Sequence, residues 1–364
     1  VLERAHDPRF PFDVARMMGK QGLLGITFAP EDGGQGGSLI DAVIAIEQIA
    51  QVCPRSADVV QAGNFGPIRT FVQYATPVQK QKYLPGLLSG NAVISLGMSE
   101  PEAGSAATEL RTAARIEGSE VVLNGTKVFS THSTDASLFL VYVRFGPGTG
   151  GIGSVLVERD APGLVLGRPS QFMSGEEWCQ LYFEDCRIPK ENILLGAGGF
   201  KKQISGFNVE RLGNSARSLG LGAFAFNLAR DHAATRRQFG RLLCEFQGLQ
   251  WKFADMALKL ESARLMLYRA ALELDAQGLP SAYNTSLAKL ACNLAGFEAA
   301  NEAVQIMGGT GYSMEALAEY CMRRTRGWMI AGGSIEMLKN RIAEGVFDRR
   351  FDQRGAMPAS KAAE

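Results

Sequence analysis

The sequence predicts a mainly α-helical protein with a β domain in the middle of the chain. Between residues 93 and 190, apolar and polar residues alternate with the period of two that is typical of strands. On either side, apolar residues recur three and four positions apart, which is the spacing of one helical face. We therefore expect a helical N-terminal domain over 1–93, an antiparallel, barrel-like β domain over 94–198 and a four-helix bundle over 199–348. The polar residues 349–364 are expected to be a disordered tail.

The N-terminal region is expected to form helices separated by glycine-rich breaks. Residues 41–51 are helical by composition, and residues 77–88 form a short helix with Thr76 as its N-cap. Between the first helices, the glycine-rich segment 31–37 is predicted to be a tight connecting loop. These glycines have no strand-to-helix context, so they do not indicate a phosphate-binding site.

The middle region contains a series of short strands. They are predicted at 121–123, 127–129, 138–143, 155–157, 164–166 and 180–183. Asn124-Gly125 is the predicted hairpin turn between the first two. Residues 148–153 match the G-x-G-x-x-G pattern of dinucleotide-binding sites, but that pattern must follow a strand and open a helix. Because a strand stands on each side here, we expect a flexible hairpin loop.

The last region carries four amphipathic stripes, which can bury one another as a bundle. The stripes are Leu212, Ala216, Leu219, Ala223 and Phe226; Leu249, Phe253, Met256, Leu260, Ala263, Leu267, Ala270 and Leu274; Leu287, Leu290, Leu294, Phe297 and Val304; and Ile335, Leu338 and Ile342. In the first helix, Asn208, Glu210 and Arg211 are expected in the opening turns. An acceptor, a carboxylate and a guanidinium would then share one helix end.

Composition argues against several classes of protein. A net charge of +1 in 364 residues gives no general attraction to nucleic acid or to acidic membranes. No apolar run is long enough to span a bilayer. Six cysteines without a CxxC pair indicate reduced thiols in a cytosol-like compartment, and three histidines far apart predict no metal site. The chain opens with Val1 rather than Met, so we expect residues before it.

Four motifs occur in the order and at the spacing of one enzyme family. Residues 98–105 (Met-Ser-Glu-Pro-Glu-Ala-Gly-Ser) resemble the T-E-P-x-A-G-S signature of the acyl-CoA dehydrogenases, and residues 123–131 resemble L-N-G-x-K-x-W-I-T. Residues 236–247 are similar to R-x-x-F-G followed by a glutamine, and residues 303–312 to A-V-Q-x-x-G-G-x-G-Y. The likeness covers nearly the whole chain.

This resemblance implies FAD bound between the β domain and the bundle, in a homotetramer built as a dimer of dimers. It places Met98, Ser99, Phe129 and Thr131 at the flavin ring. It places Arg236 and Gln238 at the pyrophosphate of a neighbouring subunit's FAD, and Gln305 and Gly309 near the adenosine. Further implied cofactor contacts are Phe239, Gln247, Ser334 and Glu336. It places Ser105, Asn208 and Arg211 at CoA, Gln61 at the acyl cavity, and Gly332 at the thioester carbonyl. The implied partners are an acyl-CoA substrate and an electron-transfer flavoprotein.

The sequence departs from the family at the catalytic base. Many members carry this base in Y-E-G-T, which here reads Ala331-Gly332-Gly333-Ser334, so glycine stands where the glutamate would be. In another branch of the family, the glutamate immediately precedes the CoA-binding arginine, as Glu210 precedes Arg211. We therefore predict Glu210 as the base and rank Glu336 second.

The predicted reaction is α,β-desaturation of a CoA thioester, with α-proton removal and β-hydride transfer to FAD. Two alternatives stay open: a related flavoenzyme that eliminates from or reduces a CoA thioester, and a non-catalytic, nucleic-acid-binding flavoprotein, which the near-zero net charge disfavours. The amides of Gln61 and Asn64 either line a polar acyl pocket or bond local backbone. Arg324, where the family has Asp, is a further departure. We expect a cytoplasmic protein, or a mitochondrial-matrix one if the source is a eukaryote.

Overall fold

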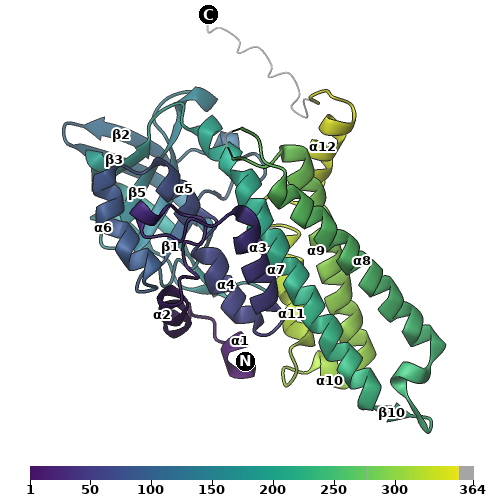
Figure 1. Ribbon diagram of the computed structural model, residues 1–364. Helices are drawn as coiled ribbons and strands as arrows, with labels where there is room; N and C mark the ends of the chain where they lie inside the picture. The colour runs from purple at the N-terminus through teal and green to yellow at the C-terminus, as the bar shows by residue number, and fades with distance from the viewer. Residues whose placement is uncertain (277, 352–364) are drawn as a thin grey trace, which may run out of the picture.

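The protein consists of a helical N-terminal region, a central sheet and a long helical bundle (Figure 1). This computed structural model describes residues 1–276 and 278–351, and it confirms the predicted fold class. In Figure 1 the sheet and the N-terminal helices occupy one end of the molecule, and the bundle extends away from them. Of the predicted tail, residues 352–364 lie outside the described part. The backbone N–H of Arg349 donates to the carbonyl of Glu344 at 3.0 Å.

Glycine and proline divide the N-terminal region into short helices, as the sequence predicts. They are α1 (Leu2–Ala5), α2 (Phe12–Lys20), α3 (Leu39–Ala50), α4 (Pro54–Ala62), α5 (Pro67–Tyr74) and α6 (Pro77–Leu88). Thr76 is the N-cap of α6: its hydroxyl accepts from the Gln79 N–H at 3.2 Å, and the Gln79 side chain accepts from the Thr76 N–H at 2.8 Å. The segment 31–37 is a connector: the 3₁₀ turn η1 (Pro30–Asp32) overlaps its start, and Gly33 has a left-handed backbone conformation.

In the described part of the chain, the middle region forms a nine-stranded sheet. Its strands are β1 (Ile94–Gly97), β2 (Ala113–Glu117), β3 (Glu120–Thr131), β4 (Leu138–Arg144), β5 (Ile152–Glu158), β6 (Leu164–Leu166), β7 (Ser170–Gln171), β8 (Glu177–Pro189) and β9 (Ile193–Leu195). Their order is β6-β8-β3-β2-β4-β5-β9, with β7 beside β8. The prediction of a purely antiparallel domain is wrong, because β1 pairs in parallel with β4. A parallel pair needs a long crossover, which the segment containing β2 and β3 supplies.

Asn124-Gly125 does not form the predicted hairpin turn, because β3 runs through it. The register of β3 against β8 shifts here, and Gly125 packs so closely that a Cβ on it would lie 2.6 Å from the Thr112 Oγ1. The turn lies instead at Gly118, whose φ of 61° suits the first position of a two-residue hairpin loop. Residues 148–153 do join two strands, β4 and β5, as predicted.

Long helices form the bundle. They are α7 (Phe200–Thr235), α8 (Gln247–Leu272), α9 (Ala282–Met307), α11 (Ala318–Trp328) and α12 (Ile335–Val346), with the short α10 (Gly309–Tyr312) after α9 and the hairpin β10–β11 (Arg237–Gln238, Arg241–Leu242) between α7 and α8. α7 begins earlier than predicted, because its first turns pack on the sheet through Phe200 and Gln203. Glu210 therefore lies inside the helix, in its third turn. No helix in the described ranges is apolar over a length that would cross a membrane.

Two predictions about the bundle are wrong. The helix that packs against both α7 and α9 to complete the bundle is α11, whose buried face combines Ala318, Tyr320 and Cys321 with the polar Glu319, Arg324 and Thr325. The predicted fourth helix, α12, packs on α9 alongside it. In α9 the predicted leucine stripe does not face the core: Leu294 is exposed, and the buried face consists mainly of small residues such as Ala288 and Gly296.

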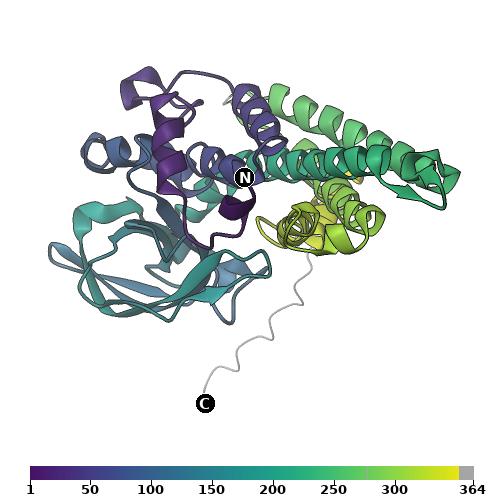
Figure 2. The ribbon, with the colours of Figure 1, turned by 90° about the horizontal axis from the view of Figure 1, so that it is seen from below.

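The N-terminal helices bring the sheet and the bundle together. α3 and α4 lie along α7, so Ile46 and Phe65 share one core with Leu212. α2, α5 and α6 pack on the sheet, and Figure 2 shows the sheet beneath them with the bundle to one side. α5 contacts both α7 and β1, so all three regions meet where α4 ends and α5 begins.

Candidate active site

Glu210 lies on α7 where the loop between α4 and α5 crosses the helix. Gly213 allows this close approach, because a Cβ at that position would lie 2.7 Å from the Phe65 ring. Phe65 is buried there, and the chain then turns at Gly66, whose φ of 73° is left-handed, into the first turn of α5. The carboxylate is thus enclosed by α7, the end of α4 and the start of α5.

The Glu210 carboxylate accepts one hydrogen bond of good geometry, and the Gly66 backbone lies close enough to it to favour the ionised form. Oε1 accepts a hydrogen bond from the Gln61 Nε2 at 3.3 Å, and the same amide donates to the Asn214 Oδ1 at 2.8 Å. Oε2 is shielded from solvent and has no partner of hydrogen-bonding geometry among the described residues. Burial raises the pKa of Glu210 to about 7, although Arg217 favours the ionised form. A carboxylate in this state can exchange a proton near neutral pH.

Arg211 and Asn208, the predicted CoA-binding pair, lie together on the same helix. The Arg211 Nη1 donates to the Asn208 Oδ1 at 3.0 Å, while the Arg211 Nε is buried and lacks a partner within the described ranges. Burial and the neighbouring Arg341 lower the pKa of Arg211 to about 10. An anionic ligand would supply the missing partner, because a guanidinium binds phosphate and carboxylate oxygens well.

Gly332 lies directly opposite Asn214 on α7. Its φ of 69° is left-handed, and a Cβ on it would lie 2.7 Å from the Asn214 Nδ2. Both the backbone and Asn214 therefore oppose a larger side chain here. The space that a glutamate side chain at position 332 would need is filled by Asn214, and Glu210 lies one turn away from Asn214 on α7.

Glu336, the second-ranked carboxylate, has different surroundings. It is exposed in the first turn of α12, whose N-cap Ser334 accepts from the Met337 N–H at 3.4 Å. Its own backbone N–H and the Ser334 hydroxyl lower the pKa of Glu336. A solvated carboxylate of low pKa is a poor general base near neutral pH.

The four residues predicted to contact the flavin ring lie close together, two in the segment after β1 and two at the end of β3. They are Met98, Ser99, Phe129 and Thr131. The Ser99 carbonyl accepts from the Val128 N–H at 2.9 Å, and the Met98 carbonyl accepts from the buried Lys127 ammonium at 3.2 Å. The segment that follows β1 therefore lies beside the last residues of β3.

Phe129 provides the observation that fits a flavin at this place. Its φ of 58° is rare for an aromatic residue, and 59% of its surface is exposed. The rings of Phe172 and Trp178 lie 6.3 Å and 4.7 Å from it, centroid to centroid. Three partly open rings form an apolar surface that fits a flat aromatic ligand such as the isoalloxazine of FAD.

Apart from Ser334 and Glu336 at the start of α12, the other predicted FAD residues lie near the opposite end of the bundle. Exposed on or beside the β10–β11 hairpin, or near the end of α9, are Arg236, Gln238, Phe239, Gln247, Gln305 and Gly309. A helix rises 1.5 Å per residue, so the end of α7 lies roughly 38 Å from Glu210. Figure 1 shows β10 and α10 at the tip of the bundle that is remote from the sheet. One chain does not bring the two groups of FAD residues together.

Ser105 is exposed in the loop that follows β1. The loop is fixed from behind by Glu100, whose carboxylate accepts from the Arg111 N–H at 2.6 Å and from the Lys127 ammonium at 2.7 Å. Ser105 thus lies on an anchored loop, open to a ligand from solvent.

The two amides considered for the acyl pocket have different environments. Asn64 bonds only backbone groups: its Oδ1 accepts from the Ile26 N–H at 2.6 Å, and its Nδ2 donates to the Val60 carbonyl at 2.7 Å. Asn64 therefore has a structural environment. Gln61 instead contacts Glu210, so the idea that both amides bond local backbone is wrong for this residue.

Four site residues have no sequence motif: Asn214, Lys289, Phe172 and Trp178. Asn214 lies four residues from Glu210 on one helix, a spacing that places their side chains on the same face. Lys289 is brought to the site by α9, Trp178 by β8, which pairs with β3, and Phe172 by the turn between β7 and β8. Only tertiary packing identifies these three.

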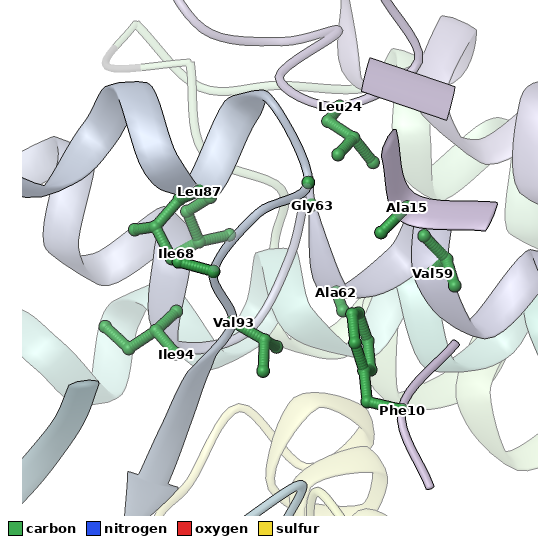
Figure 3. Close-up of a pocket in the computed structure, with 12 residues that line it drawn as sticks. Phe10, Ala15, Leu24, Val59, Ala62, Gly63, Ile68, Leu87, Val93 and Ile94 are labelled. Carbon is green, nitrogen blue, oxygen red and sulfur yellow. The ribbon is translucent and has the colours of Figure 1, made fainter. Parts of the chain in front are cut away.

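A cavity among the N-terminal helices and β1 is not part of the site. Figure 3 shows its apolar lining, which includes Phe10, Leu24, Val59, Ile68 and Ile94. Its volume of about 10 Å³ is at the limit for a single water molecule. It is a packing gap between helices rather than a ligand pocket.

Comparison with known proteins agrees with this fold. Family models described as acyl-CoA dehydrogenase N-terminal, middle and C-terminal domains match residues 1–91, 95–186 and 197–347. A 3-sulfinopropanoyl-CoA desulfinase from Paraburkholderia xenovorans is 33% identical, over 95% of this chain and 90% of the relative. A short-chain specific acyl-CoA dehydrogenase from Clostridium acetobutylicum is 34% identical, over 93% of this chain and 90% of the relative.

Solved structures show the same fold. A chain in the structure titled as the electron transferring flavoprotein of Acidaminococcus fermentans has a TM-score of 0.89 and 32% identity, covering 95% of this chain and 92% of that chain. The three domain models together account for nearly the whole sequence. This protein therefore belongs to the acyl-CoA dehydrogenase family, whose enzymes are FAD-dependent oxidoreductases.

Proposed function

We propose that the protein desaturates a CoA thioester between Cα and Cβ, with Glu210 as the base that removes the α-proton. The Glu210 carboxylate carries this proposal, because it is enclosed, has one unpartnered oxygen and has a pKa raised to about 7 by burial. A base with this pKa is largely ionised in neutral solution and can still hold the proton that it accepts.

The neighbours of Glu210 are proposed to bind the thioester. Arg211, with Asn208, is suited to an anionic part of CoA. The backbone N–H of Gly332 is proposed to donate to the thioester carbonyl and to stabilise the negative charge that develops there as the α-proton leaves. Gln61 is proposed to orient the carboxylate through Oε1 and to leave Oε2 for the proton.

FAD, when bound, supplies the acceptor for the β-hydride. We propose that the backbone at Met98 and Ser99 and the hydroxyl of Thr131 bind the polar edge of the flavin ring. Phe129 would pack against the ring and exclude water from it. Ser334 and Glu336, at the start of α12, are proposed as further cofactor contacts.

A homotetramer is proposed because the residues at the bundle tip cannot reach the flavin ring of their own chain. Arg236 and Gln238 would bind the pyrophosphate of a neighbouring subunit's FAD. The outer face of α8 supports this assembly: Trp251, Leu258, Leu265 and Leu272 recur every seven residues, and each exposes 63–67% of its surface. Seven residues are nearly two helical turns, so these side chains form one apolar row that is suited to packing against another chain.

The relatives suggest the partners. We propose a short-chain acyl-CoA as substrate, on the likeness to the short-chain specific enzyme. We propose an electron-transfer flavoprotein as the electron acceptor, on the likeness to a chain in a structure of such a protein.

The test is Glu210→Gln, a substitution that keeps the shape of the side chain and removes the proton acceptor. Anaerobic mixing of the FAD-loaded variant with butyryl-CoA should reduce the flavin at least ~100-fold more slowly than in wild type, because general-base catalysis contributes about that much. FAD content and thioester affinity should stay as in wild type. Stopped-flow absorbance of the flavin measures the rate.

Glu336→Gln is the matched control, since it makes the same substitution at the exposed carboxylate. It should retain rapid flavin reduction, with at most weaker cofactor binding. A Glu210→Gln enzyme that reduces its flavin at the wild-type rate would remove Glu210 from the mechanism and make Glu336 the next candidate.

Elimination is the second candidate, favoured by the similar 3-sulfinopropanoyl-CoA desulfinase and by the glycine at 332. A desulfinase removes the sulfinate group from its substrate, which requires no net oxidation of the acyl chain. Loss of the sulfinate group from 3-sulfinopropanoyl-CoA, combined with no flavin reduction by any saturated acyl-CoA, would favour elimination over desaturation.

A further inference from the structure

Lys289 is a fully buried lysine on α9 that no step of the proposed reaction uses. Its ammonium donates to the Trp328 carbonyl at 2.9 Å and to the Gly333 carbonyl at 3.1 Å. Asn293, four residues further along α9, donates to the same Trp328 carbonyl at 2.6 Å. A buried lysine keeps its charge only with such partners, so these two carbonyls are its environment.

The two carbonyls bracket the loop between α11 and α12. Trp328 is the last residue of α11, and Gly333 directly precedes Ser334, the N-cap of α12. One ammonium therefore ties both ends of the loop together. Within it, Gly332 and Gly333 have φ values of 69° and 95°, so the loop follows a path that only glycine adopts easily.

The same lysine borders the place where Gly332 packs against Asn214, which lies one turn from Glu210 on α7. A Cβ on Gly332 would lie 3.5 Å from the Lys289 Cε, so the lysine chain packs under this glycine. Glycine itself provides no side chain that could fix the loop. The position of the loop therefore depends on the groups, such as the Lys289 ammonium, that bond the carbonyls at its two ends.

We propose that Lys289 is a positioning residue, whose ammonium holds the loop so that the Gly332 backbone N–H points at the thioester carbonyl beside Glu210. This inference rests on the proposed function. It assigns to Lys289 both a geometric effect on thioester binding and an electrostatic effect on the ionisation of Glu210.

The electrostatic effect follows from the charges around the pair. Arg211 and Arg217 on α7 and Arg341 on α12 are the other cations that influence these groups. Burial and Arg211 lower the pKa of Lys289 to about 7, and Glu210 opposes this. Lys289 in turn favours the carboxylate form of Glu210, so removing its charge should raise the pKa of the base.

The experiment compares Lys289→Met, which removes charge and donors, with Lys289→Gln, which keeps donors, and Lys289→Arg, which keeps charge. The affinity of each FAD-loaded variant for a non-oxidisable 3-thia-acyl-CoA is measured by calorimetry. The rate of flavin reduction by butyryl-CoA is measured from pH 5.5 to 9. Lys259→Met is the control, because Lys259 is a surface lysine paired with Glu298 on the outside of the bundle.

Lys289→Met should bind the analogue at least tenfold more weakly, and the acidic limb of its pH profile should move to higher pH. Lys289→Gln should bind the analogue more tightly than Lys289→Met does, yet the acidic limb of its pH profile should also move to higher pH. Lys289→Arg should leave the acidic limb where it is in wild type. If Lys289→Met does not fold, the affinity and pH profile of Lys289→Gln test the proposal. Wild-type affinity and an unmoved limb in these variants, even with a lower melting temperature, would reduce Lys289 to a structural role.

Failure of this inference is distinct from failure of the proposed function. Rapid flavin reduction by Glu210→Gln would overturn the proposed function and the positioning role with it. An inactive Glu210→Gln enzyme together with wild-type behaviour in the Lys289 variants would overturn only the role of Lys289.

Discussion

Burial raises the pKa of Glu210 to about 7, and no cation forms an ion pair with the carboxylate among the described residues that would cancel this effect. Gln61 contacts its Oε1, and burial is the largest influence on its pKa. Glu176 provides the contrast. Burial would raise its pKa as well, but it lies between Arg324 and Arg55, which hold the pKa well below the usual range. The difference between a base and a structural anion is therefore decided by a few neighbouring side chains.

The raised pKa of Glu210 predicts how stability depends on pH. Because the folded-state pKa of about 7 exceeds the ordinary value of 4.5, the folded protein binds more protons than the unfolded chain between these values. The stabilising contribution of Glu210 to the free energy of unfolding is therefore present at low pH and is lost as the pH rises through 7. Between pH 5 and pH 8, the free energy of unfolding of Glu210→Gln should increase by roughly 2–3 kcal/mol relative to that of wild type.

Urea denaturation of the FAD-loaded proteins at both pH values measures this difference. Glu336→Gln is the control, since the pKa of this exposed carboxylate is lowered rather than raised. An equal stability difference between Glu210→Gln and wild type at pH 5 and pH 8 would contradict the raised pKa.

At the scale of elements, small residues decide how closely α9 approaches α7. Gly222 and Gly296 face each other, and a Cβ on Gly296 would lie 2.3 Å from the Ser218 carbonyl oxygen. The distance between packed helices depends on the side chains at their contact, so two glycines permit a close crossing. The leucines of α9 therefore lie on other faces, and Lys289 and Asn293 reach the loop after α11.

Gly296→Ala should consequently destabilise the bundle by about 1–3 kcal/mol, because the added methyl group meets backbone that cannot move without separating the helices. The midpoint of urea denaturation measures the effect. Gly86→Ala in α6 is the matched control: its Cβ would meet only the Ala92 side chain, at an ordinary 3.4 Å. Similar midpoints for the two variants would show that the α7–α9 contact adapts to the extra atom.

At the scale of the whole molecule, a buried ionic cluster joins the three regions. Asp58 on α4 pairs with Arg55 at 3.0 Å, with Arg217 on α7 at 3.0 Å, and with Arg324 on α11. Glu176, from the turn before β8, pairs with Arg55 at 3.1 Å and with Arg324. This explains the departure at Arg324: arginine fits there because two carboxylates from other regions meet it.

The assembly proposal also belongs to this scale. Leu258→Glu combined with Leu265→Glu places two charges in the exposed apolar row on α8. The molar mass of the protein measured by light scattering should therefore be lower than that of wild type. It should also retain less FAD per chain, because the bundle tip of a neighbour would no longer contribute. Val78→Glu, at an equally exposed valine in α6, should change neither property. An unchanged mass for the double variant would remove α8 from the interface.

The sequence by itself determined the class and order of the elements, because the periods of two and of three to four are properties of local backbone geometry. It placed Thr76 at the start of α6 for the same reason, since a cap acts within one turn. The motifs also indicated the family, which the domain models confirm.

Tertiary structure alone decided features that depend on contacts between distant segments. The parallel pairing of β1 and the bulge at Gly125 arise from the arrangement of the whole sheet. The core helix α11 buries an arginine beside its apolar residues, because carboxylates supplied from elsewhere in the chain stabilise that arginine. The raised pKa of Glu210 and the contacts of Lys289 likewise require α4, α7, α9 and the loop at Gly332 to meet in space. Burial and charge pairing act across space rather than along the chain, so local sequence patterns do not encode them.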